Sequence, residues 1–176
     1  MTAPARGPGG LRLAVLAAAG LSACQAGGIP PRDGEQEPEI ISLAAGTHCG
    51  HGSREPAARW LDTADAWQAA YRRMNRQVLG PDSPPPQPPD FTRYGILQVF
   101  MGQQSTGGYR LRLLQPQLGH TPAGASVRVE WLPPPPGTLS TQVLTSPCLV
   151  LAVPRGAYRS LRVTDQRGRT RAVAEL

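Results

Sequence analysis

Two histidines and a cysteine stand close together in one short stretch: His48, Cys49 and His51. Imidazole nitrogen and thiolate sulfur are good ligands for zinc and copper, so this stretch could hold a metal ion. A structural zinc site needs four ligands, however, and the sequence shows no evident fourth. Catalysis would need a nucleophile, a base and an orienting group, and none of the three histidines stands in such a set. We therefore expect no metal, no cofactor and no enzymatic activity.

A different chemistry is indicated for the first cysteine. Two arginines precede an apolar run over residues 13–20, which is too short to span a bilayer, and Leu21-Ser22-Ala23-Cys24 follows it. The tetrad resembles the bacterial lipobox, in which signal peptidase II cuts before a cysteine whose thiol carries a diacylglycerol. We therefore expect a lipoprotein signal peptide over residues 1–23 and a fatty-acylated Cys24 that anchors the chain in a membrane. The alternative is an ordinary signal peptide in which this cysteine is incidental.

The residues after Cys24 indicate where the protein goes and where it folds. In the inner-membrane retention signal of Gram-negative lipoproteins, an aspartate follows the lipidated cysteine. This chain has Gln25 at that position, so we expect the protein at the periplasmic face of the outer membrane. Residues 24–39 are rich in glycine, proline and acid without apolar periodicity, which predicts a flexible tether. The folded domain is expected over residues 40–176, as a monomer.

The two remaining cysteines, Cys49 and Cys148, form an even pair in an oxidising compartment. We expect a disulfide between them. Closing a loop of about a hundred residues should contribute about 4–5 kcal/mol to stability by chain entropy, before strain is subtracted.

The positive charge of the chain is a feature that nucleic-acid-binding proteins share. All 18 basic residues are arginines, against 12 acidic ones, so the formal net charge is +6. The sequence shows no zinc-finger spacing, no helix-turn-helix pattern and no platform of aromatic and basic residues, so we do not expect nucleic acid as a partner. The arginines between residues 159 and 174 mostly alternate outward, which fits a solvated face or attraction to anionic lipid.

The first half of the domain contains the one predicted helix. Residues 40–45 are typical of a strand, residues 46–58 of a loop, and residues 61–80 of a helix with Asp62 or Thr63 as its N-terminal cap. Along the helix Trp67, Tyr71, Met74 and Val78 form an apolar stripe, which is more typical of core packing than of binding.

The centre of the chain predicts a β-hairpin over Asp90–Gln115. Tyr94–Met101 is rich in β-branched and aromatic residues, and Tyr109–Leu114 alternates between apolar and arginine. Between them lies the tip, Gly102–Gly108, whose three glycines suit positive φ or close approach by another chain.

The second half of the domain remains β. Val127 to Trp131 alternates, residues 142–144 suggest a short strand, and Cys148–Val153 is a continuous apolar run typical of a strand buried on both faces. Residues 159–164 and 169–174 flank the turn residues 165–168 and predict a C-terminal hairpin. The fold class is therefore α+β, mainly β: an antiparallel β-sandwich-like domain of about seven to eight strands with one packed helix after the first strand.

A family resemblance rests on five stretches of the domain: AWQAAYRR, DFTRYGILQVFMG, STGGYRLRL, VRVEWLPPPPG and QVLTSPCLVLAVPR. Together they resemble the C-terminal domain of the protease complex subunit PrcB family, over roughly residues 40–165. The most specific piece is Thr106-Gly107-Gly108-Tyr109. The family often has an aromatic residue after the proline that is Pro147 here, and this chain has Cys148 instead. Its members are similar in being bacterial lipoproteins, and the namesake supports the assembly or stability of a surface protease complex.

This resemblance implies a non-catalytic envelope lipoprotein that binds and stabilises or assists a partner protein, such as a protease or protease complex. The expected contact is the tip together with the tyrosine that follows it: Gln104, Ser105, Thr106, Gly107, Gly108 and Tyr109. The alternative is a protease inhibitor, because TGGY is similar to the TTGY loop of chagasin-like inhibitors. An Asn-Pro pair before the threonine would favour the inhibitor, and Gln104-Ser105 stands there instead.

Overall fold

The structure is a computed structural model, and it describes residues 38–75, 87–121 and 124–176. A compact unit spans residues 36–176. The predicted signal peptide, Cys24, nearly all of the predicted tether and the predicted end of the helix at residues 76–80 lie outside the described residues. Within the described part of the chain, no helix is long and apolar enough to cross a membrane.

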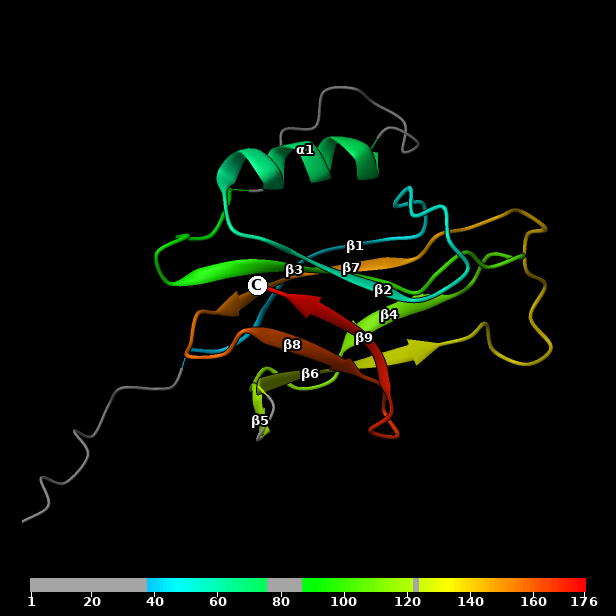
Figure 1. Cartoon of the computed structure of the whole chain (residues 1–176). Coiled ribbons are helices and arrows are strands. Elements are labelled where there is room, and N and C mark those ends of the chain that lie inside the picture. The colour runs from blue at the N-terminus through cyan, green and yellow to red at the C-terminus, as the bar shows by residue number, and fades with distance from the viewer. Residues whose placement is uncertain (1–37, 76–86, 122–123) are drawn as a thin grey trace, which may run out of the picture. The chain divides into compact units, whose positions relative to one another are not determined.

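Nine strands and one helix make up the described part of this unit, which confirms the mainly-β α+β class (Figure 1). In chain order they are β1 (Ile41–Gly46), β2 (Ala57–Leu61), α1 (Ala64–Asn75), β3 (Tyr94–Phe100), β4 (Arg110–Leu113), β5 (Gly119–Thr121), β6 (Gly124–Leu132), β7 (Cys148–Pro154), β8 (Ser160–Thr164) and β9 (Thr170–Glu175).

The first sheet has the order β1-β7-β3-β2, and all its pairs are antiparallel. Its two inner strands are buried on both faces because each face has its own cover. Alternate residues on one face, Ile96 and Val150 among them, pack with Trp67 of α1. Residues of the opposite parity, such as Leu97 and Leu151, pack against the second sheet. Every residue of β7 is buried, as its continuous apolar run predicts.

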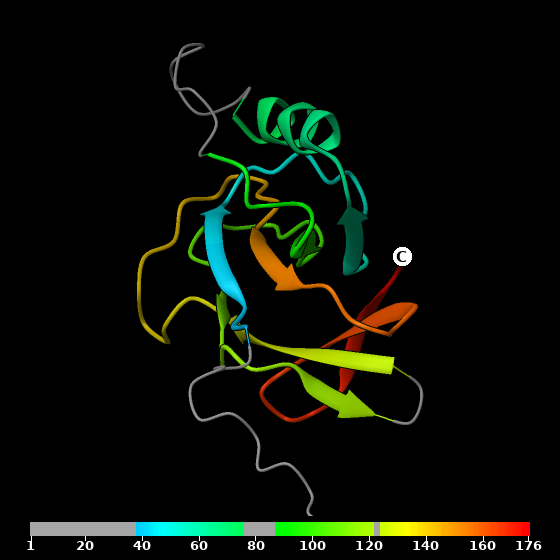
Figure 2. The ribbon, with the colours of Figure 1, turned by 90° about the vertical axis from the view of Figure 1, so that its left-hand side faces the viewer.

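The second sheet has the order β4-β6-β8-β9, with β5 also paired to β6. Figure 2 shows the resulting layers: α1, then the first sheet, then the second sheet. β6 and β8 run parallel, with Val127 opposite Val163, so the expectation of a fully antiparallel fold is wrong at this pair. The reason is the path of the chain. After β6 the chain returns through β7 in the other sheet, and β8 therefore runs in the same direction as β6.

The helix follows the second strand and not the first, because part of the predicted loop 46–58 is strand β2. β2 lies at the edge of the first sheet and is short and rich in alanine, so it lacks a clear alternation. The helix itself begins at Ala64, where the Ala66 amide donates to Thr63 Oγ1 at 3.2 Å. Of the two predicted caps, Thr63 is therefore the one that makes this bond.

The predicted central hairpin is wrong, although both of its strands exist. β3 pairs with β2 and β7 in the first sheet, whereas β4 pairs with β6 in the second sheet. Residues 101–109 therefore cross from one sheet to the other. The two burial patterns already differ, since β3 is buried on both faces and β4 alternates, and strands of such different patterns suit different sheets. The strand suggested at residues 142–144 is also absent; the neighbouring Thr145 makes only an isolated bridge.

The predicted C-terminal hairpin is confirmed as β8 and β9. Asp165 in its turn is only 2% exposed and accepts hydrogen bonds at Oδ1 from the amides of Arg167 (2.9 Å) and Arg169 (3.0 Å). Burial would raise the pKa of Asp165, but these amides and the Arg169 guanidinium outweigh that effect and hold the pKa below its ordinary value.

Candidate functional site

Three connections meet at the end of the two sheets where β3 and β6 finish and β7 begins, and we call this region the loop end. They are residues 47–56, 101–109 and 133–147. The strand register places them together, because Phe100 lies opposite Cys148 and Ala57, while Arg110 lies opposite Leu132 (Figure 1). The residues predicted to bind a partner are in the second of these connections.

The 101–109 connection is bonded along its length to the 133–147 connection. Gln104 and Thr145 exchange two backbone hydrogen bonds, each 2.9 Å long. The Thr145 hydroxyl donates to the Thr106 carbonyl at 3.0 Å, and the Gly107 amide donates to the Thr141 carbonyl at 2.9 Å. The stretch is therefore a fixed part of the fold rather than a free hairpin tip.

Two glycines in this connection lie in close contact with the 133–147 connection. A Cβ added at Gly107 would lie 2.5 Å from Thr141 Oγ1. Gly108 has a φ of +91°, and an added Cβ would lie 2.8 Å from the Pro134 Cβ. The close approach that the sequence suggested for these glycines is thus made by the protein's own 133–147 connection.

The six predicted contact residues differ in how much they offer a partner. Ser105 and Gly108 are exposed, Gly107 is buried, and Gln104, Thr106 and Tyr109 are half-buried. Tyr109 packs against the core cluster between the sheets, so its ring serves the fold. Gln104 and Ser105 remain as the polar side chains most available for binding.

The structure adds three exposed apolar side chains that sequence reasoning missed: Leu139 (105% exposed), Val143 (46%) and Leu144 (57%). All three lie in the 133–147 connection, and two of them lie between its bonded residues Thr141 and Thr145. Exposed apolar side chains are ordinary when scattered, but a group of them marks an interaction site. Together with Gln104 and Ser105 they form what we call the loop patch. Residues 142–144 suggested a short strand, so the exposure of Val143 and Leu144 was not predicted.

The histidine and cysteine stretch has structural partners at this same end. Cys49 forms a disulfide with Cys148, with Cα atoms 5.9 Å apart, which is the pairing that cysteine arithmetic predicted. His51 Nε2 lies 3.1 Å from the Glu55 carbonyl oxygen, and the ring of His51 stacks on Phe100 with centroids 4.9 Å apart. Within residues 38–75, 87–121 and 124–176, no group of three potential metal ligands comes together.

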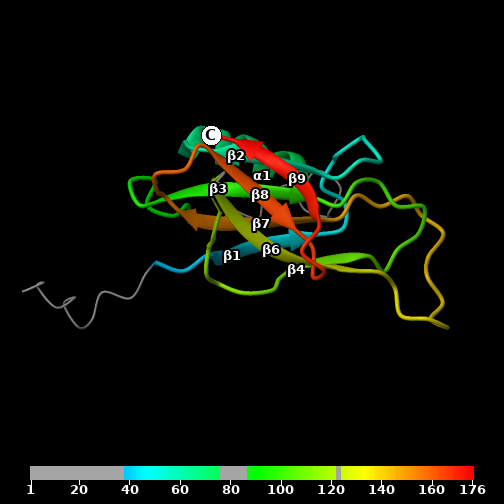
Figure 3. The ribbon, with the colours of Figure 1, turned by 60° about the horizontal axis from the view of Figure 1, so that its bottom comes forward.

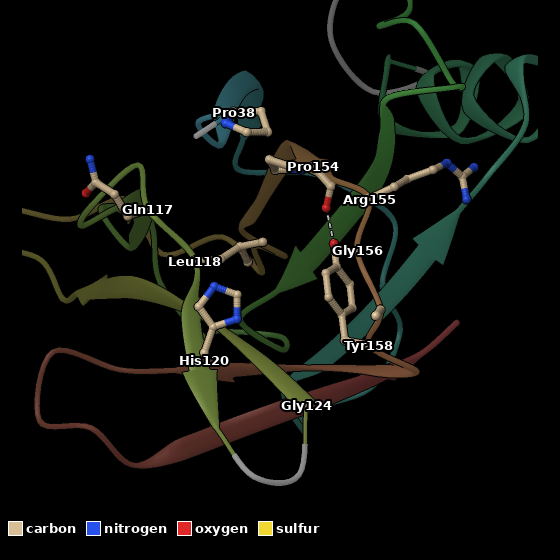
Figure 4. Close-up of a pocket in the computed structure, with 10 residues that line it drawn as sticks. Pro38, Gln117, Leu118, His120, Gly124, Pro154, Arg155, Gly156 and Tyr158 are labelled. Carbon is tan, nitrogen blue, oxygen red and sulfur yellow. Dashed lines mark hydrogen bonds between the residues drawn. The ribbon is translucent and has the colours of Figure 1, made fainter. Parts of the chain in front are cut away.

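A cavity of ≈ 460 Å³ lies at the opposite end of the sheets, between β5 and the connection from β7 to β8 (Figure 4). Its lining is largely apolar, with Leu118 and the ring of Tyr158 on facing sides, and His120 contributes an imidazole. The Tyr158 hydroxyl donates to the Pro154 carbonyl, and burial raises the pKa of Tyr158 to about 12. The hydroxyl is therefore occupied and neutral, which suits a wall of the cavity rather than a reactive group.

Arg155 also borders this cavity, but its guanidinium is turned away from it (Figure 4). Its Nε donates to the Phe91 carbonyl at 2.8 Å, and a terminal nitrogen donates to the Asp62 carbonyl at 3.3 Å. Of the residues that line the cavity, His120 is thus the one that combines exposure with a titratable group facing it. The geometry can hold a small apolar group, and it presents no nucleophile with a base.

The described part of the chain is therefore a mainly-β unit. It has two packed sheets, one covering helix and a hydrogen-bonded pair of connections at one end. Within it, residues 96–154, from inside β3 to the end of β7, match the family described as PrcB C-terminal. This confirms the resemblance over a narrower range than residues 40–165. No curated protein and no solved structure matches the chain.

Proposed function

We propose that the protein is a non-catalytic lipoprotein of the bacterial envelope that binds a partner protein through the loop patch. The observation that carries the proposal is the exposure of Leu139, Val143 and Leu144 in a connection that is hydrogen-bonded to the one carrying Gln104 and Ser105. Binding energy at protein interfaces comes mainly from a few anchors that become buried, with polar groups around them. The loop patch has that composition.

The loop patch is also held in place before any partner arrives. The backbone bonds between Gln104 and Thr145 fix the two connections to each other, and the Cys49–Cys148 disulfide fixes the start of β7 beneath them. A surface that is already ordered loses less conformational entropy on binding, which raises affinity for a given contact area.

A catalytic role finds no support in the contacts of the described residues. Ser146 Oγ bonds to His51, but only through the backbone amide and carbonyl of that residue, each at 3.1 Å. The His51 ring instead bonds to Glu55, so the serine has no imidazole base there. Activation of a nucleophile would require the opposite arrangement.

The family resemblance suggests a protease or protease complex of the envelope as the partner, with Cys24 as the membrane anchor at the periplasmic face of the outer membrane. An accessory role fits better than direct inhibition through TGGY. The Gly107 backbone is buried and its amide is already bonded to Thr141, so the centre of this motif offers little main chain to a protease cleft.

Site-specific photo-crosslinking in cells tests the proposal. A photoreactive residue replaces Ser105 or Leu144 in the loop patch, and Ile41, 47% exposed on β1 outside the loop end, serves as the matched control. We expect positions 105 and 144 to capture the same protein, which position 41 does not capture. Capture from position 41 alone, or different proteins from the two patch positions, would refute the loop patch as the binding surface.

A further inference from the structure

The net positive charge of the protein is concentrated in the part of the chain that builds the second sheet. In the described residues up to Phe100, five arginines are balanced by five acidic residues. In the described residues from Met101 onward, nine arginines stand against three acidic residues, and the strand of the first sheet in this part, β7, carries none of them. Most of this charge therefore falls on the second sheet and its connections, with Arg155 as an exception because it bonds to the Phe91 and Asp62 carbonyls.

Five of these arginines lie on the strands themselves. Arg171 of β9 is half-buried and pairs with Asp165 at 3.7 Å. The other four point away from the core. Arg110 and Arg112 are exposed on either side of buried Leu111. Arg128 alternates with the buried valines of β6, and Arg162 is exposed between two buried residues of β8. We call Arg110, Arg112, Arg128 and Arg162 the arginine face, which belongs to the sheet that comes forward in Figure 3.

Acidic residues neutralise this face only in part. Glu130 pairs with Arg112 at 2.6 Å, and Glu175 lies exposed on β9. Arg128 bonds to the neutral amide of Gln115 at 3.4 Å. Arg110 and Arg162 make no ion pair with any carboxylate of the described residues. The arginine face therefore keeps unpaired cations that are available to an anionic surface.

Exposed aliphatic side chains accompany the arginines. Val173 of β9, 45% exposed, is the register partner of Arg162. Leu114, 38% exposed, comes directly after β4. Arginine beside exposed aliphatic groups suits the boundary of a bilayer, where cations meet phosphate groups and apolar side chains enter the headgroup region.

The chain enters the folded unit beside this sheet. The Ile40 amide donates to the Pro116 carbonyl at 2.7 Å, and Gln117 donates to Glu39 at 3.4 Å. Pro116 and Gln117 belong to the connection between β4 and β5. The residues between Cys24 and Pro38 can reach at most about 45–50 Å when fully extended, so an anchor at Cys24 would keep the folded unit within that distance of its membrane.

We propose that the arginine face docks onto the anionic phosphate headgroups of a lipid bilayer. The identity of this bilayer, as the membrane in which the protein is anchored, rests on the proposed function. Docking of the arginine face requires only the folded unit.

Vesicle co-sedimentation tests the docking with the chain from Gln25 onward, which lacks the proposed anchor and keeps the whole compact unit. A cooperative thermal transition first verifies folding. Binding is measured on vesicles of phosphatidylcholine alone and of phosphatidylcholine mixed with phosphatidylglycerol. The test variant is Arg128→Gln with Arg162→Gln, and the control with equal charge change is Arg72→Gln with Arg73→Gln on exposed positions of α1.

We expect binding only to the vesicles with phosphatidylglycerol, with an affinity that falls as salt is added. The test variant should lose about 25-fold in affinity, at about 5-fold per arginine, while the control stays within about 2-fold. Equal losses in both variants would assign the effect to net charge and overturn the proposal. Binding to heparin without binding to anionic vesicles would overturn it in favour of a soluble polyanion. Because the shortened chain lacks the proposed anchor, neither of these results would contradict the proposed lipidation of Cys24.

Discussion

Adding one methyl group at Gly107 should destabilise the protein through contact with a single atom of Thr141. The added Cβ would lie 2.5 Å from Thr141 Oγ1, which is about 1 Å less than a favourable carbon–oxygen separation. Overpacking of this kind typically costs about 1–3 kcal/mol. For a unit of this size that corresponds to a fall of roughly 3–10 °C in melting temperature. Urea denaturation of Gly107→Ala and the unaltered protein measures the difference.

A double-mutant cycle identifies the cause. Thr141 is exposed, so Thr141→Ala alone should change stability by less than about 0.5 kcal/mol while it removes the clashing hydroxyl. In the Thr141→Ala background, Gly107→Ala should then lower the free energy of unfolding by only a few tenths of a kcal/mol. The coupling free energy between the two substitutions would be about 1–2 kcal/mol. If Gly107→Ala costs the same in both backgrounds, or costs nothing in either, the close contact is not what requires the glycine.

Gly108 provides the matched comparison. Its φ of +91° would strain alanine whatever the neighbouring side chains do, so Gly108→Ala should be destabilising both with Thr141 intact and together with Thr141→Ala. Partner capture from position 105 should follow stability in these variants. It should be weakened in Gly107→Ala and recovered when Gly107→Ala is combined with Thr141→Ala.

Three further predictions concern the anchor, the disulfide and the buried carboxylate. Cys24→Ala should release the protein from the membrane fraction, because it removes the acylated thiol; continued sedimentation with outer membranes would contradict the lipoprotein proposal. Replacing Cys49 and Cys148 by alanine should lower stability by about 4–5 kcal/mol at most while the fold persists, since the bond closes a long loop; unchanged melting would show that the bond contributes nothing. The lowered pKa of Asp165 means that its carboxylate stabilises the fold above the ordinary value of 3.8 and loses this effect as the pH falls through the folded-state pKa. Asp165→Asn should therefore be less stable than the unaltered protein near neutral pH and approach it in acid, and parallel stability curves down to the lowest pH would refute the assignment.

Local patterns in the sequence predicted most of the elements. The continuous apolar run of β7 and the alternation of β6 correspond directly to what each strand buries on its two faces. The helix stripe was likewise correct for Trp67, which is fully buried, and Met74, which is 6% exposed. Such patterns indicate whether a residue is buried, but they do not indicate which neighbouring strand buries it.

The pairing of strands within the sheets could not be predicted in the same way. β3 and β4 are joined by a glycine-rich segment that suits a hairpin, yet they pair in different sheets: β3 with β2 and β7, and β4 with β6. β2 was missed because an edge strand of alanine, arginine and tryptophan has no strong period. For the candidate site, the close approach that Gly107 and Gly108 suggested is present, but it is made by a segment about thirty residues away, whose exposed apolar side chains carry no local signal.

The central position of β7 has a consequence for how the protein folds. β7 is the hydrogen-bonded neighbour of both β1 and β3, although it follows β1 by about a hundred residues. The first sheet cannot assemble until residues 148–154 are available, and contacts so distant in sequence are closed late and slowly. A nascent or truncated chain that ends before Cys148 would contain β1, β2 and β3 without the strand that joins β1 to the others. The domain is therefore expected to fold only after nearly its whole length has been made, and shortened versions that stop before β7 should be sensitive to proteolysis.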